Sequence, residues 1–159
     1  LEDVLGAIVG TRDPENGELD KKARARLETI ARTNISEAFN QAALAVYSDP
    51  DIGDFVEALQ YSAILDSRVT DFCEAYHRRI YLKNDAIWQH ITPPNHFSCR
   101  SMLIPITMFD EYTSNDRAAA NKKGEVIQPG KGFGKLKTDK NGKPVTDKAG
   151  KPIDIPIND

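Results

Sequence analysis

Apolar residues recur at helical spacing along the first third of the chain, from about Leu19 to Tyr47. No Gly or Pro interrupts this run, and the turn-forming residues Ser48, Asp49 and Pro50 follow it. The spacing predicts one long helix that packs through an apolar stripe, while charged residues keep much of the remaining surface in water. The stripe consists of Leu27, Ile30, Ala31, Ile35, Ala38, Phe39, Ala42 and Val46.

Two later segments have the partial alternation of apolar and polar residues that is typical of strands. The first runs from Ala58 to Leu65, and the second runs from Cys99 to Thr107. A third, short strand is predicted over Ile80 to Leu82. The residues predicted to share a face are Leu59, Tyr61, Ala63 and Leu65 in the first strand, and Met102, Ile104 and Ile106 in the second.

Short helices are predicted between and after these strands. Asp66 directly follows the first strand, where its carboxylate can cap a helix from Ser67 to about Arg79. Further helical segments are predicted over Ile52 to Val56, Asp85 to His90 and Met108 to Ala120. The fold class is therefore α+β: a long N-terminal helix plus short helices packed on a small, mostly antiparallel sheet, with an extended C-terminal arm.

Composition divides the 159 residues into a core and two flanking parts. A hydrophobic content of 40% is enough for one domain of ordinary size. We expect residues 1–15 to be a linker or the remnant of a longer N-terminal region, and residues 16–121 to be the core. Residues 122–159 are rich in Lys, Gly and Pro and include a tandem eight-residue repeat over residues 138–153. Because the repeat has few apolar groups, we expect an extended arm that becomes ordered on a partner.

The net charge of −3 is unevenly distributed. Residues 119–159 hold nine Lys and five acidic residues, for a net charge of +4, which leaves −7 on residues 1–118. A basic arm on an acidic body suits an anionic protein surface or genomic DNA, although a solvated polar tail has the same composition. We favour a protein partner, because the interspersed acidic residues would repel a phosphate backbone. The candidate arm contacts are Lys131, Lys140, Lys143, Lys148 and Lys151.

The segment from Tyr61 to Ile106 concentrates the residues with special chemistry, since it holds both cysteines, all three histidines and the only tryptophan. Cys73, His96 and Cys99 form a candidate zinc site, with Asp66 or His77 as the fourth ligand, because zinc takes thiolate, imidazole and carboxylate ligands. Two alternatives remain open. The two cysteines are joined by a disulfide, or they are packed free thiols beside a hydrogen-bonded network of Asp66 and Arg68.

Catalysis has little support in the sequence, and we assign no catalytic residue. A Cys–His hydrolase would need His96 or His77 beside a low-pKa thiolate and an oxyanion site, but no nucleophile elbow or Gly-rich loop accompanies them. The absence of a phosphate-binding loop argues against a packaging ATPase. No apolar run is long enough to span a membrane, and no signal peptide is visible. We therefore expect a cytoplasmic site of synthesis and reduced thiols.

An ordered set of short motifs runs along this chain. It begins with residues 26–30 (RLETI) and 32–34 (RTN) and continues with residues 65–68 (LDSR). The later members are Cys73, Ile80, Tyr81, Asp85, Trp88, Pro93, Pro94, Asn95, Cys99 and Arg100, with a weak Gly-Phe turn at residues 132–134. Together they resemble the phage Mu F-like head morphogenesis family over roughly residues 22–134. Cys73 stands where many members have His, and Ser101 stands where most have a second Cys.

The resemblance implies a minor head protein that associates with the portal vertex and acts in head morphogenesis and genome packaging or delivery. It implies a location in the virion head, host cytoplasm during assembly, and portal protein and other virion subunits as partners. The competing interpretations are a DNA-binding accessory protein and, with less support, a Cys/His enzyme or toxin-associated module. The exchange of His and Cys at position 73 suits a ligand position.

The resemblance also implies a structural network. In this network the Arg32 guanidinium ties the long helix to the later loop. We predict in addition that Asp66 and Arg68 are largely buried and hydrogen-bonded, and that they organise the Pro-Pro-Asn loop. The complete set is Arg32, Asp66, Arg68, Trp88, Asn95 and Arg100.

Overall fold

The computed structural model describes residues 21–130 together with Phe133 and Val145. It confirms an α+β fold that combines a long N-terminal helix with a three-stranded antiparallel sheet. The elements in chain order are α2 (Lys21–Tyr47), a 3-10 turn (Gly53–Phe55), β1 (Val56–Ser62), α3 (Asp71–Tyr76), β2 (Ile80–Leu82), α4 (Trp88–Ile91) and β3 (Met102–Thr107). None of the helices in the described part of the chain is long and apolar enough to cross a membrane.

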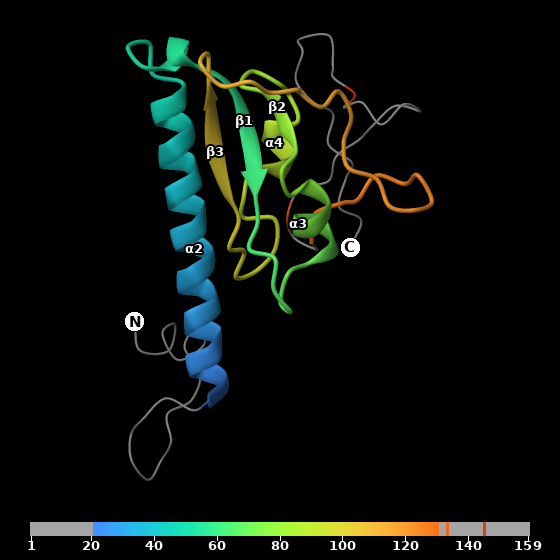
Figure 1. Cartoon of the computed structure of the whole chain (residues 1–159). Coiled ribbons are helices and arrows are strands. Elements are labelled where there is room, and N and C mark those ends of the chain that lie inside the picture. Colours follow the sequence, from blue (N-terminus) through green and yellow to red (C-terminus); the bar gives the residue numbers. More distant parts are fainter. Residues whose placement is uncertain (1–20, 131–132, 134–144, 146–159) are drawn as a thin grey trace.

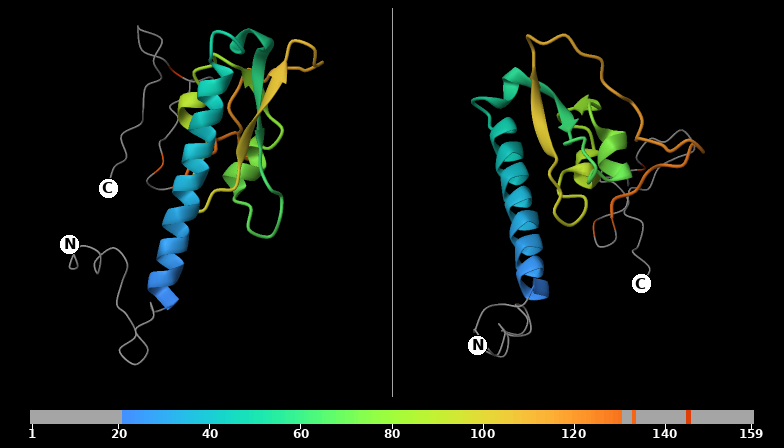
Figure 2. Two further views of the ribbon diagram at one scale, coloured as in Figure 1. Left: turned by 90° about the vertical axis from the view of Figure 1, so that its left-hand side faces the viewer. Right: turned by 60° about the horizontal axis from the view of Figure 1, so that its bottom comes forward.

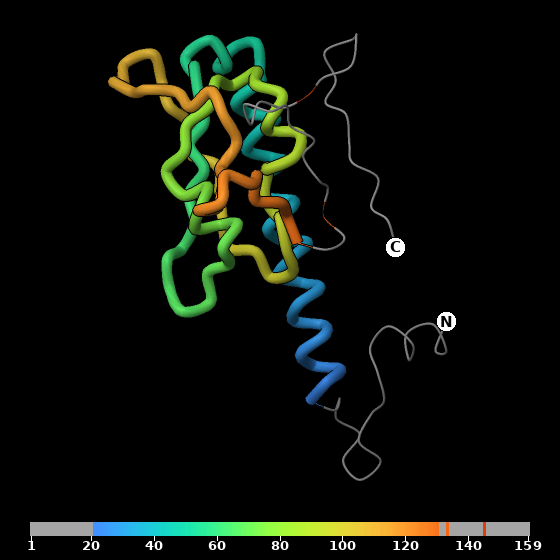
Figure 3. Tube along the Cα trace, turned by 90° about the vertical axis from the view of Figure 1, so that its right-hand side faces the viewer, coloured from blue at the N-terminus to red at the C-terminus, as the bar shows by residue number. Residues whose placement is uncertain are grey.

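The sheet has the order β2-β1-β3, so the longest strand is central and is hydrogen-bonded on both sides. Leu59 pairs with Tyr81 on β2, and Tyr61 pairs with Leu103 on β3. All four side chains are buried, and they form the core with residues of α3 and α4. α2 runs alongside β3 at one edge of the sheet, while α3 and α4 lie toward the other edge, near β1 and β2 (Figures 1 and 2). The first turns of α2 extend beyond the sheet (Figure 3).

The predicted long helix is present, but its predicted packing face is wrong. Most residues of the apolar stripe are exposed, including Ile30, Ile35, Phe39 and Val46. The buried side of α2 instead contains Asn40. Asn40 bonds to Ser101 and to Leu103 of β3, and Leu44 and Tyr47 pack against the core, while the apolar stripe stays in contact with solvent.

The short elements also differ from their predicted limits. The helix predicted from Ser67 begins later, because Thr70 rather than Asp66 is its N-cap and accepts a hydrogen bond from the Cys73 N–H. β1 ends at Ser62, so Leu65 lies beyond the strand and is exposed. In β3 the predicted face is the outer one: Met102 and Ile104 are exposed, and Leu103 is buried between them.

The segment after β3 is an extended strap rather than the predicted helix over residues 108–120. Asn115 makes two hydrogen bonds with the backbone of Ile80 and thereby follows the free edge of β2. The chain then turns, and Val126 and Ile127 pack against the core. Contacts with the core therefore continue past the predicted boundary at residue 121, and the boundary itself stays a prediction.

Candidate functional site

Three potential metal ligands converge between α3 and the loop before β3. The Sγ atom of Cys73 lies 3.1 Å from His96 Nε2 and 3.9 Å from Cys99 Sγ. All three ligand atoms lie within 4.8 Å of one another. The sulfur–sulfur distance is nearly twice the length of a disulfide bond, and both cysteines are free thiols. The structure therefore brings together the three residues that the sequence singled out.

A tight turn positions His96 and Cys99 on the same side of the loop. The Cys99 N–H donates to the His96 carbonyl at 3.2 Å, and Ser98 adopts a left-handed backbone conformation with φ of 56°. The turn is fixed from both sides. The Ser98 N–H donates to Thr33 of α2, and the Gly130 N–H donates to the Asn95 carbonyl. Gly130 also packs so closely that an added Cβ would lie 3.2 Å from the His96 Cβ.

The tautomer of His96 follows from its surroundings. Its Nδ1 lies 2.9 Å from the Phe97 carbonyl oxygen, which can only accept, so Nδ1 carries the proton. Nε2 is then an unprotonated acceptor that faces the Cys73 sulfur. An imidazole held this way is ready to bind a proton or a metal ion through Nε2.

A buried polar chain supports Cys73 from inside the core. The Asn95 amide donates to the Ile91 carbonyl at 2.7 Å and to the Tyr61 hydroxyl at 3.2 Å. Because Tyr61 accepts from Asn95, its own O–H is free to donate to the Cys73 sulfur, 3.3 Å away. Burial raises the pKa of Tyr61 far above its ordinary value, so it remains a neutral donor.

The two thiols differ in acidity because they share hydrogen bonds. Hydrogen bonds from Cys73 and from the backbone at Asn95 and Ser101 lower the pKa of Cys99 to about 5. The contact with Cys99, together with burial, raises the pKa of Cys73 to about 11. The hydrogen bond with Cys73 raises the pKa of His96. The shared hydrogen bonds therefore make Cys99 the more acidic of the two thiols.

The Asp66 carboxylate binds Arg100 and is not part of this cluster. Its two carboxylate oxygens accept from the Arg100 guanidinium at 2.7 and 2.6 Å. Arg68 lies 4.0 Å away, with its side chain 74% exposed. The prediction that Asp66 and Arg68 are largely buried is therefore wrong, because both reach into solvent. Of the two proposed fourth ligands, Asp66 is occupied by Arg100, and His77 Nδ1 accepts from the Ala63 N–H.

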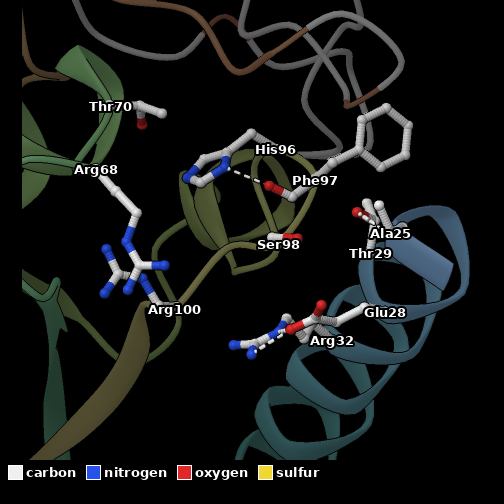
Figure 4. A pocket seen from close by; sticks show the side chains of 10 residues that line it. All are labelled: Ala25, Glu28, Thr29, Arg32, Arg68, Thr70, His96, Phe97, Ser98 and Arg100. Atoms are coloured by element: carbon white, nitrogen blue, oxygen red, sulfur yellow. Dashed lines mark hydrogen bonds and ion pairs between the residues drawn. The ribbon is translucent and has the colours of Figure 1, made fainter. Parts of the chain in front are cut away.

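A cleft of about 400 Å³ separates the cluster from α2. Figure 4 shows Arg68 and Arg100 on one wall, Arg32 and Glu28 on the wall formed by α2, and His96 between the two walls. Arg32 donates to Glu28 one helical turn earlier and so does not tie α2 to the later loop, in contrast to its predicted role. Since Arg32 and Arg100 already bind carboxylates, the cleft is not a ready anion site.

Thr33 and Asn40 perform the tethering that was expected of Arg32. The Thr33 hydroxyl accepts from the Ser98 N–H at 2.9 Å. The Asn40 side chain donates to the Ser101 carbonyl and accepts from the Leu103 N–H. Sequence reasoning missed both residues, although an Asn in a helix interior is itself a signal, because Asn disfavours that position unless its amide has a partner.

An apolar groove of about 270 Å³ runs between α2 and β3. Ile35 and Phe39 line it from the helix, and Met102 lines it from the strand. These three side chains are exposed, although each is large and apolar. Exposed apolar surface of this kind is typical of a site for another protein.

Two groups of predicted residues remain, namely Trp88 and the Lys residues of the arm. Trp88 is buried in the core, where its indole N–H donates to the Leu82 carbonyl. The candidate arm contacts Lys131, Lys140, Lys143, Lys148 and Lys151 lie outside the described residues, and their roles stay predictions.

Comparison with known proteins gives two matches. A model of the family "Phage Mu protein F like protein" matches residues 12–104. The "Mu-like prophage FluMu F protein" of Haemophilus influenzae is 37% identical over 96 residues, which cover 60% of this chain and 23% of that protein. The chain thus spans about a quarter of the length of this relative. No solved structure matches.

Proposed function

Because this chain belongs to the phage Mu protein F-like family, we propose that it is a minor head protein of a phage or prophage particle. In this proposal it binds at the portal vertex, assembles with portal protein and other virion subunits, and acts in head morphogenesis and in genome packaging or delivery. Its role is structural rather than enzymatic.

The observation that carries this proposal is the outward apolar side of α2. Ile35 is 69% exposed and Phe39 is 55% exposed, on a helix whose buried side contains the polar Asn40. The apolar surface continues onto Met102 and Ile104 of the outer face of β3. Burying exposed apolar surface stabilises association by about 25 cal/mol per Å². A second subunit that covers this groove would explain why the apolar side of α2 faces away from the core.

The test is co-purification of the full chain with the portal protein of the same phage. Phe39→Ser removes the largest apolar group of the groove, so we expect loss of portal binding while the circular dichroism spectrum is unchanged. Gln41→Ser is the matched control, because Gln41 is exposed on the same helix and is not among the groove residues. Equal portal binding by the wild type and the Phe39→Ser variant would contradict the proposal.

The DNA-binding alternative predicts a different pattern. DNA binding through the Lys-rich arm would weaken steeply with salt, because each neutralised phosphate releases counterions. A chain truncated before Lys131 would then lose DNA binding and keep portal binding. Loss of portal binding in the truncated chain, with its core still folded, would instead assign the arm to the protein interface.

A further inference from the structure

We propose that Cys73, His96 and Cys99 bind one zinc ion whose fourth ligand is a water molecule rather than a fourth side chain. The proposal concerns a different part of the molecule from the apolar groove and does not depend on the assembly role. It rests on the spacing of the three ligand atoms, the tautomer of the histidine, the hydrogen bonds around the sulfurs and the space beside them.

The distances suit a tetrahedral zinc ion. With Zn–S bonds of about 2.3 Å and Zn–N bonds of about 2.0 Å, ligand atoms in a tetrahedron lie about 3.5–3.8 Å apart. The Cys73 sulfur is 3.9 Å from the Cys99 sulfur and 3.1 Å from His96 Nε2. His96 Nε2 and the Cys99 sulfur lie within 4.8 Å of each other, so an ion would draw these two ligand atoms closer together. The His-x-x-Cys spacing within one tight turn is also common among zinc ligands.

The surrounding hydrogen bonds favour the ligand forms of all three residues. His96 donates through Nδ1 to the Phe97 carbonyl, which leaves Nε2 to face the cluster. Tyr61 can donate to the Cys73 sulfur, and the Cys73 thiol can donate to the Cys99 sulfur. Partners that orient metal ligands and stabilise thiolates in this way accompany real metal sites.

The chemistry of the ligands selects the metal. Two thiolates and an imidazole are soft to intermediate ligands, which favour zinc over the magnesium and calcium that prefer oxygen. Two thiolates also neutralise the double charge of zinc, so the buried site would carry no net charge. Because the ligands bind as thiolates, any proton that the two thiols carry would be released to solvent on binding.

The fourth position has no protein ligand among the described residues. Asp66 is occupied by Arg100, and His77 accepts from the Ala63 N–H. A cavity of about 10 Å³ is lined by Cys73, His96 and Ser101, among others. That volume is about what one water molecule requires. The cleft of Figure 4, which His96 also lines, provides a route for the ion.

The first experiment measures zinc in the reduced full chain, purified from zinc-supplemented cells without chelator. We expect about one zinc per chain, because two thiolates and an imidazole are ligands that zinc prefers. Replacing zinc with cobalt should give a thiolate-to-cobalt absorption band that is lost in Cys99→Ser. His77→Ala is the matched histidine control and should keep the metal. A reduced chain that holds no zinc and gives no cobalt band would overturn the proposal, as would a Cys73–Cys99 disulfide found in the freshly purified chain.

A second pair of variants tests the fourth ligand while all three proposed zinc ligands are kept. Ser101→Cys places a third thiolate beside the cavity, so we expect a stronger cobalt band, one additional sulfur ligand by X-ray absorption, and tighter zinc binding. Ser101→Ala should leave the coordination unchanged. A cobalt spectrum altered by Ser101→Ala would make the hydroxyl the fourth ligand, and no gain of sulfur in Ser101→Cys would contradict the proposed open position.

Discussion

Asn40 and Phe39 are adjacent on α2, yet their environments are opposite. Asn40 is 1% exposed and makes hydrogen bonds with Ser36, Ser101 and Leu103. Phe39 is 55% exposed and lines the apolar groove. The helix is therefore held along β3 by directional bonds from a few polar groups together with the packing of Leu44 and Tyr47 against the core. Its apolar side is left available to a partner, and this separates the fold of the chain from its assembly.

The largest effect on stability is expected from removing the buried amide of Asn40. Asn40→Ala leaves the Leu103 N–H and the Ser101 carbonyl without their side-chain partner. Each buried polar group left unpaired costs about 1–3 kcal/mol, so we expect a clear loss in the free energy of unfolding, measured with denaturant. Asn34→Ala is the control on the exposed side of the helix. Equal stability of the two variants would show that α2 is held by other contacts.

The next effect in size concerns Thr33. Thr33→Val keeps the shape of the side chain and removes the acceptor of the Ser98 N–H. A typical intramolecular hydrogen bond contributes about 0.5–1.5 kcal/mol, so we expect a loss within that range in the same denaturation measurement. Thr29→Val is the matched control, because the Thr29 hydroxyl bonds only within the helix, to the Ala25 carbonyl. A larger effect at Thr29 would contradict the proposed tether.

Lowering the pH should weaken the ion pair between Asp66 and Arg100 and leave the uncharged hydrogen bonds that hold α2 in place. The Arg100 guanidinium holds the pKa of Asp66 below its ordinary value. The unfolded chain therefore binds the Asp66 proton first, and the stabilising contribution is present above pH about 4 and is lost below it. We expect the melting temperature to fall between pH about 5 and 3 more in the wild type than in Asp66→Asn. Equal slopes would show that the ion pair adds no stability.

The smallest effect on stability is expected on the apolar side of α2. Ile35 is 69% exposed, and substitutions at such surface positions usually change stability by about 0.5 kcal/mol or less. Ile35→Ser should therefore leave the unfolding curve nearly unchanged while it lowers self-association in light scattering. A loss of stability as large as that of Asn40→Ala would mean that the apolar side is part of the fold after all.

The extent of α2 was predictable from the sequence, but its orientation was not. An uninterrupted helical pattern from Leu19 to Tyr47 identified the helix that the structure describes from Lys21 to Tyr47. Periodicity shows which residues share a face, but it does not show whether the chain itself or another protein covers that face. The assumption that the apolar stripe meets the core therefore failed at Ile35 and Phe39.

The candidate site was predictable where it depended on residue type and short spacing. His96 and Cys99 are three positions apart, so a turn brings them together. Their meeting with Cys73 could be proposed only from the ligand chemistry of the three side chains, because no local rule places residues 23 and 26 positions apart side by side. The Arg100 partner of Asp66 and the Thr70 cap could not be predicted, since several nearby residues could have filled each role.

The tether of α2 also has a consequence for synthesis on the ribosome. Asn40 binds a carbonyl that is 61 residues later in the chain, and Thr33 binds an N–H that is 65 residues later. At about 5–20 residues per second, the helix emerges roughly 3–13 s before its anchor exists. During that interval both of its sides are free, so nascent chains on one message can meet through Ile35 and Phe39. The same groove would then favour early encounters between neighbouring copies, and chaperones that bind apolar helices would have their longest opportunity at this stage.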